Sequence, residues 1–111
     1  MVTQSLQGAV TILSVGSTLD GEEGGELLEQ TDAIPRVGRT QLVVDLNACP
    51  LVDSAGCESL LDVYDAVNDR DGAVLLAGAS PLVSDIFLAT GVDRFFESFD
   101  GVNEAVRSFT R

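Results

Sequence analysis

The group in this sequence best placed for chemistry is a serine hydroxyl at the predicted start of a helix. Ser54 lies in the segment Asp53-Ser-Ala-Gly56, between an apolar strand predicted at Gln41–Leu46 and an amphipathic helix. The small residues that follow Ser54 leave its hydroxyl open to another molecule. Such a serine can act as a nucleophile, as a helix cap or as a site of modification, and the rest of the sequence narrows these roles.

The residue types needed for self-contained catalysis are largely missing. The sequence has no histidine, and its six basic residues are all arginines. Ser–His and Cys–His nucleophile pairs therefore cannot form, and no histidine or lysine can serve as a general base. Cys49 and Cys57 are eight positions apart, which matches neither a C-x-x-C redox motif nor a zinc knuckle. We expect both cysteines to pack as small apolar residues, and we expect no enzymatic activity, cofactor or metal ion.

The charge of the chain excludes two classes of partner. Eighteen acidic residues against six basic ones give a formal net charge of −12. Nucleic acid and anionic membranes both attract cationic surfaces, so we expect no direct nucleic-acid binding and no attachment to a membrane surface. The charge either steers a partner with an electropositive face or only keeps the protein in solution, and both interpretations stay open.

Length and hydrophobicity predict one domain, which we expect to span residues 1–111. The 111 residues are close to the commonest domain size, and 45% of them are hydrophobic, which is enough for a packed core. No apolar run approaches the roughly 20 residues of a membrane span, and the first residues lack the features of a signal peptide. We therefore expect a cytoplasmic protein without membrane insertion.

Strand and helix signals alternate along the chain, which predicts an α/β fold with a parallel or mixed sheet. The predicted elements are strands at Val2–Leu6 and Ala9–Val15, a helix at Glu22–Ile34, the strand Gln41–Leu46, a helix at Ala55–Asn68, the strand Ala73–Ala77, a helix from Pro81 that stops at Gly91, a short strand or turn at Phe95–Phe99, and a helix at Val102–Phe109. In the first helix, we expect Gly24 and Gly25 to loosen the first turn.

Helical spacing also predicts which side chains face the core. The inward residues expected are Cys57, Leu60, Leu61, Tyr64 and Val67 in the helix after Ser54, Leu82, Val83, Ile86 and Phe87 in the helix after Ser80, and Val102, Ala105, Val106 and Phe109 in the last helix. Ser80 is the expected cap of its helix, with Pro81 in the first helical position.

Two roles compete for Ser54 at this stage. As a cap, its oxygen would accept a hydrogen bond from a free backbone N–H of the first helical turn, a position that Asp53 could fill equally well. As a modification site, its hydroxyl would point outward to a kinase. The residues alone leave both roles open.

The segment around Ser54 resembles the signature of the STAS domain, the fold of bacterial anti-sigma factor antagonists. The family pattern is an aliphatic strand ending in Asp-Leu, a short link, and then Asp-Ser-Ser/Thr/Ala-Gly opening a helix with paired leucines, and the run from Leu42 to Leu61 is similar to it. Three further segments resemble family motifs, namely Gly16-Ser-Thr-Leu-Asp20, Ser80-Pro-Leu-Val83 and Ala89-Thr-Gly-Val-Asp-Arg-Phe-Phe96. The resemblance implies a mixed sheet of four to five strands with about four helices packed mainly on one face.

The resemblance also implies a mechanism called partner switching. In that family, the unmodified antagonist binds an anti-sigma factor of the GHKL kinase type and releases the sigma factor. Phosphorylation of the motif serine breaks the complex, and a PP2C-type phosphatase restores it. On this chain the implied phosphoacceptor is Ser54. The implied partner surface is formed by Asp20, Asp53, Ser54, Ala55, Gly56, Cys57 and Glu58, with Ala55 and Gly56 keeping the approach open.

Other functions remain possible from the sequence. The chain could be the STAS subunit of a lipid-transport ABC system, docking on its ATPase, although serine at position 54 favours the antagonist. It could instead be a STAS scaffold protein of a sensory assembly. An enzymatic alternative places a metal ion between Asp20, Asp45 and Asp53, but the lysine of a receiver-like site is missing.

Overall fold

The computed structural model describes residues 1–110, which form a five-stranded sheet and four α-helices. The elements are β1 (Val2–Gln7), β2 (Val10–Val15), α1 (Gly21–Asp32), β3 (Gln41–Asp45), α2 (Ser54–Asn68), β4 (Ala73–Ala77), α3 (Pro81–Thr90), the 3-10 helix η1 (Val92–Arg94), β5 (Ser98–Phe99) and α4 (Val102–Ser108). The strands lie in the order β1-β2-β3-β4-β5. Only β1 and β2 are antiparallel, so the sheet is mixed, as predicted.

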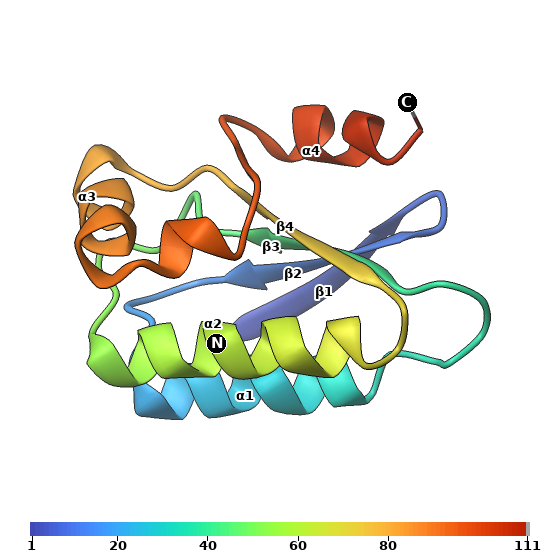
Figure 1. Cartoon of the computed structure of the whole chain (residues 1–111), viewed down its shortest axis with the longest axis horizontal. Coiled ribbons are helices and arrows are strands. Elements are labelled where there is room, and N and C mark those ends of the chain that lie inside the picture. The colour runs from blue at the N-terminus through green and yellow to red at the C-terminus, as the bar shows by residue number, and fades with distance from the viewer. Residues whose placement is uncertain (111) are drawn as a thin grey trace.

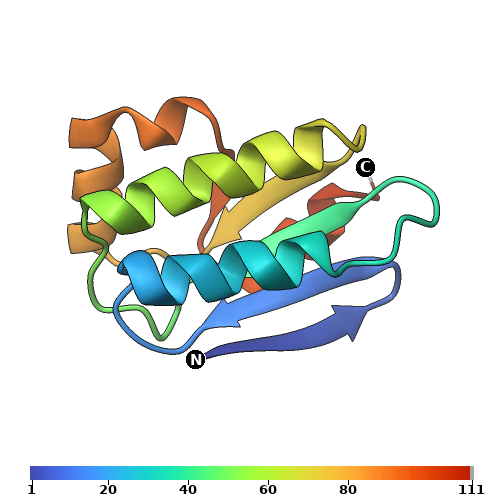
Figure 2. The same ribbon diagram turned by 90° about the horizontal axis from the view of Figure 1, so that it is seen from below.

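Helices cover both faces of the sheet, most of them on one side. Helices α1 and α2 lie side by side on the same face, and α4 lies on the opposite face (Figures 1 and 2). Alternate residues of β3 face the two sides, because Val44 belongs to the cluster under α1 and α2 whereas Val43 packs with Ala105 of α4. This double burial explains why β3 is a continuous apolar run in the sequence.

The first helix differs from its prediction because of close packing. We expected Gly24 and Gly25 to loosen its first turn, but α1 is continuous from Gly21. A Cβ at Gly24 would collide with the side chain of Ser59 on α2, whereas nothing lies within 4 Å of a Cβ at Gly25. Gly24 therefore allows α1 and α2 to approach each other, and the contact offsets its low helix propensity.

The inward residues predicted for two helices need correction. Leu82 is not an inward residue of α3 but is 55% exposed, because α3 buries only a narrow stripe that contains Val83 and Phe87. In α2, Val63 is fully buried although it was not among the predicted inward residues. This helix packs against α1 as well as against the sheet, so a wider part of its surface is buried than the prediction assumed.

The signals at the ends of α3 are confirmed. The Ser80 hydroxyl accepts a hydrogen bond from the N–H of Val83 at 3.2 Å, and Pro81 occupies the first turn. Gly91 ends the helix with a φ of 82°, a left-handed conformation that glycine adopts without strain. No helix within residues 1–110 combines the length and apolar character that crossing a membrane demands.

Candidate functional site

The cap of helix α2 is Asp53, which decides between the two residues that the sequence offered for this position. A side-chain oxygen of Asp53 accepts a hydrogen bond from the N–H of Gly56 at 2.8 Å, and the Asp53 backbone is extended. Ser54 is the first residue of the helix itself. The interpretation of Ser54 as the helix cap is therefore wrong, because the neighbouring carboxylate fills that position.

The Ser54 side chain is exposed at the N-terminus of α2. Within the part of the chain that the structure describes, its hydroxyl has no hydrogen-bond partner. Ala55 beside it is also exposed, and Glu58 lies exposed one helical turn further on. The hydroxyl is thus free of a structural role and accessible to another protein.

The loops that carry Asp20 and Asp53 are joined by backbone hydrogen bonds. Leu19 donates its N–H to Leu51 at 2.9 Å, and its carbonyl accepts the N–H of Asp53 at 3.2 Å. Asp20 caps α1 in the same way that Asp53 caps α2, by accepting the N–H of Glu23 at 2.9 Å. The resemblance placed Asp20 and Asp53 on one surface, and the structure brings their loops together, so that the starts of the two helices lie next to each other.

Gly56 has a different place from the one expected. It was assigned to the partner surface as a residue that keeps the approach open, but it is buried. A Cβ at this position would overlap the backbone carbonyl of Leu19. Gly56 therefore lets the first turn of α2 pack directly against the Leu19 loop, and this contact fixes the position of Ser54.

Cys57 is also buried, with 6% of its surface exposed, so it contributes no accessible surface to a partner in this conformation. Its sulfur lies 4.0 Å from the Thr90 hydroxyl at the end of α3. Burial raises the pKa of the Cys57 thiol, and burial likewise raises the pKa of Cys49. Both cysteines are free and buried, as the sequence analysis predicted.

One exposed residue of this surface was missing from the sequence-based set. Leu51 immediately precedes the buried Val52 and is 42% exposed. The signal was present in the segment Pro50-Leu-Val-Asp53, because in extended backbone a buried residue is flanked by outward ones. The exposed surface around Ser54 thus combines an apolar residue, Leu51, with the carboxylates of Asp53 and Glu58.

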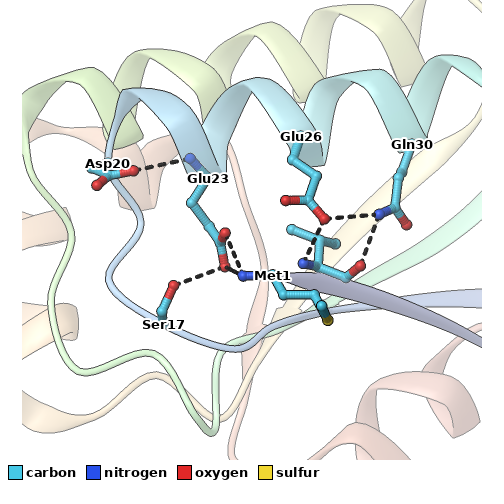
Figure 3. A network of polar contacts seen from close by, with 7 residues as sticks. Met1, Ser17, Asp20, Glu23, Glu26 and Gln30 are labelled. Atoms are coloured by element: carbon cyan, nitrogen blue, oxygen red, sulfur yellow. Dashed lines mark hydrogen bonds and ion pairs between the residues drawn. The ribbon is translucent and has the colours of Figure 1, made fainter.

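A buried carboxylate holds the Asp20 loop in place (Figure 3). Glu23 is 6% exposed and accepts hydrogen bonds from the Met1 amine at 2.6 and 2.7 Å and from the Ser17 hydroxyl at 3.0 Å. The hydrogen bond to Glu23 raises the pKa of the Met1 amine. Glu23 was not among the residues predicted to be functional, because burial of an acidic side chain leaves no pattern in the sequence.

The three aspartates of the enzymatic alternative do not form a metal site. Asp45 accepts hydrogen bonds from the Ser14 hydroxyl at 3.0 Å and from the Asn47 side chain at 2.7 Å. Asp20 and Asp53 each cap a helix instead. Among residues 1–110, no three His, Cys, Asp or Glu side chains are grouped so that they could hold a metal ion.

A family model matches almost the whole chain, and solved structures share its fold. The family model described as the STAS domain matches residues 2–105. A Thermotoga maritima protein provisionally assigned as an anti-sigma factor antagonist is 17% identical, with a TM-score of 0.88 over 99% of this chain and 95% of that one. The antagonist SpoIIAA in its unphosphorylated form is 16% identical, with a TM-score of 0.81 over 99% and 96% of the two chains.

The same fold occurs in transporter proteins. A sulfate transporter family protein from Wolinella succinogenes is 16% identical, with a TM-score of 0.79 over 94% of this chain and 87% of that one. A search of curated proteins gives no significant match. At these identities the solved structures establish the fold alone, so the function has to be argued from the site.

Proposed function

Because the chain belongs to the STAS domain family, we propose that it is an anti-sigma factor antagonist that works by partner switching. In its unmodified form it binds an anti-sigma factor kinase of the GHKL type and so releases a sigma factor. Phosphorylation of Ser54 breaks that complex, and a PP2C-type phosphatase reverses the modification. The protein is a binding module in this scheme and supplies no catalytic group of its own.

The observation that carries this proposal is the exposed Ser54 hydroxyl without an intramolecular partner. Asp53 accepts the hydrogen bond from Gly56 that caps the helix, so removing the hydroxyl as a donor or acceptor costs the fold little. Gly56 holds the first turn against the Leu19 carbonyl and so presents Ser54 at a fixed position. The hydroxyl is thus accessible, is held in a defined place and is not needed by the fold, and these three properties support Ser54 as the phosphoacceptor.

The position also accepts a phosphate without unfolding the helix. A phosphate on Ser54 adds about −1.5 to −2 charges near neutral pH. An anion at a helix N-terminus is stabilised by the free N–H groups and the helix dipole, by roughly 0.3–1 kcal/mol. The first residue of α1, Gly21, lies against Ala55, since a Cβ on Gly21 would be 3.5 Å from that of Ala55. The N-terminus of α1 adds to this favourable potential. Together the two helix N-termini offset the repulsion from the exposed carboxylates of Asp53 and Glu58, and the modified domain stays folded.

The complex, in contrast, is sensitive to the added charge. A partner surface that packs on the neutral Ser54 hydroxyl and on Leu51 has to desolvate the phosphate or lose contact with it. A penalty of ~3 kcal/mol weakens binding by over a hundredfold, since each decade of affinity corresponds to ~1.4 kcal/mol. Modification thus changes affinity while the fold stays the same, which is the behaviour required of a switch.

The test compares charges placed at two helix N-termini. Ser54→Asp adds one negative charge at the start of α2, and Asn103→Asp adds the same charge in the first turn of α4 on the other face of the sheet. We expect Ser54→Asp to bind a GHKL-type anti-sigma factor of the same organism at least a hundredfold more weakly than the wild type in isothermal titration calorimetry. Asn103→Asp and Ser54→Ala should bind as the wild type does. Equal binding by Ser54→Asp and the wild type would refute the proposal.

A further inference from the structure

Strand β1 forms one edge of the sheet, and its backbone alternates between inward and outward hydrogen-bonding groups. The N–H of Gly16 donates to the Met1 carbonyl at 2.9 Å, which makes these two residues a hydrogen-bonded antiparallel pair. The register runs without a break from Val2↔Val15 to Gln7↔Val10. Because hydrogen-bonded pairs alternate, the N–H and C=O groups of Val2, Gln4 and Leu6 point away from β2.

Side chains of helix α1 bind the outward N–H and C=O of Val2, whereas the outward groups of Gln4 and Leu6 are free. Glu26 accepts the N–H of Val2 at 2.9 Å, and Gln30 donates to the Val2 carbonyl at 2.8 Å, so the two side chains replace a neighbouring strand (Figure 3). Within residues 1–110, the outward backbone groups of Gln4 and Leu6 have no hydrogen-bond partner. Leu6 itself is 65% exposed.

The free part of this edge lacks the usual protection against pairing. Edge strands are commonly blunted by lysines or other charges, by proline or by a β-bulge. Strand β1 has none of these, because its sequence is Val-Thr-Gln-Ser-Leu-Gln and its register is regular. Residues 2–19 include no charged side chain at all, although the chain carries a net charge of −12. Two copies that meet along the β1–β2 hairpin therefore bring no carboxylate of these two strands against another.

We propose that β1 pairs with β1 of a second copy, antiparallel, so that one sheet continues through both molecules. In such a dimer, with its two-fold axis perpendicular to the sheet, residues that lie opposite each other point to the same face. Since side chains alternate between the faces, the sequence numbers of two paired residues must add up to an even number. The register centred on Ser5 places Gln4 opposite Leu6 of the second copy. The outward groups of both residues then form four backbone hydrogen bonds, and the part of the edge held by α1 is left aside.

The dimer leaves the phosphorylation surface free. Helix α1 contacts β1 and β2, whereas α2, which carries Ser54, contacts β4 further across the sheet (Figure 2). The acidic residues of two α1 helices repel each other across the interface, and salt screens this repulsion over about 10 Å at 0.1 M and about 3 Å at 1 M. The dimer therefore becomes stronger as the salt concentration rises.

The first test is crosslinking at a position next to its own symmetry mate. Ser5 and its copy form a non-hydrogen-bonded pair in this register, with Cα atoms about 4.5 Å apart, close enough for a disulfide. We expect Ser5→Cys to form a covalent dimer when its thiols are oxidised by diamide. Thr3→Cys is the matched control, since it is exposed on the same face of β1 but lies opposite Gln7 of the second copy. The native cysteines are buried, so they do not compete. Equal crosslinking of the two variants would overturn the proposal.

The second test uses charge at the same position. Ser5→Glu and Ser5→Lys each place like charges opposite each other. In 0.15 M salt, where the screening length of about 8 Å exceeds the separation of the pair, each variant alone should sediment as a monomer in analytical ultracentrifugation at a protein concentration at which the wild type is dimeric. An equimolar mixture should sediment as a heterodimer, because the opposite charges attract. The wild type should dimerise increasingly with concentration and with salt. A wild type that stays monomeric at millimolar concentration in 1 M salt contradicts the proposed pairing.

Discussion

The division of roles between Asp53 and Ser54 can be tested by removing each side chain separately. Asp53→Ala deletes the oxygen that accepts the Gly56 N–H at 2.8 Å. Loss of an N-cap costs about 0.5–2 kcal/mol, and the lost interaction of the carboxylate with the helix dipole adds roughly 0.3–1 kcal/mol. We take about 1.5 kcal/mol as the expected loss in the free energy of unfolding. Ser54→Ala removes a hydroxyl without a partner and should change that energy by less than about 0.5 kcal/mol.

These energies convert into melting temperatures that are easy to separate. With an unfolding entropy of about 2.1 cal/mol/K per residue, a domain of 111 residues loses about 6 °C for 1.5 kcal/mol and less than about 2 °C for 0.5 kcal/mol. Differential scanning calorimetry at neutral pH measures both variants. Asp53→Asn keeps the acceptor oxygen and should recover most of the loss, since asparagine caps helices about as well as aspartate. If Ser54→Ala melts as low as Asp53→Ala, the serine is a structural cap and our reasoning is wrong.

Three further predictions follow from packing and burial. Gly56→Ala forces a Cβ into the Leu19 carbonyl and should lower the free energy of unfolding by at least about 2 kcal/mol in urea titrations. The control Gly25→Ala places its Cβ in open space within a helix and should raise that free energy by up to about 1 kcal/mol. Arg70→Met removes the guanidinium hydrogen bonds to the carbonyls of Thr31, Ile34 and Pro35, in the last turn of α1 and just after it, of which the shortest is 2.7 Å. It should cost about 2 kcal/mol by the same titration, with Arg70→Lys recovering only part. Cys49 and Cys57, whose pKa values burial raises, should react with an aromatic disulfide reagent at pH 8 only as fast as the protein unfolds; fast labelling of the native protein would contradict their burial.

The sequence predicted most of the elements because their signals are local. The strand Ala73–Ala77 has the predicted bounds, since an apolar run between turn residues has few alternatives. The start of α3 was predicted from two adjacent residues, a capping serine and a proline. Half of the remaining ends also match, and the others differ by one or two residues, because fraying and caps decide the limit. The exception is the short strand predicted from Phe95, which begins only at Ser98.

The site was predicted less completely, because burial depends on contacts between distant segments. Gly56 was placed at the surface, and only its contact with the Leu19 carbonyl reveals that it faces inward. The identity of the cap was open for the same reason, since adjacent Asp53 and Ser54 can both cap a helix and backbone geometry selects one. The position of α4 on the second face also requires the folded sheet, because an amphipathic helix does not specify which face it covers.

The most direct test of the account is to locate the phosphate itself. Purified protein is incubated with ATP and its anti-sigma factor kinase, and the modified residue is identified by tandem mass spectrometry of peptides. We predict a single phosphate on Ser54 and a complex that dissociates as the phosphate accumulates. A phosphate on any other residue, or a complex that dissociates while Ser54 stays unmodified, would contradict the central claim.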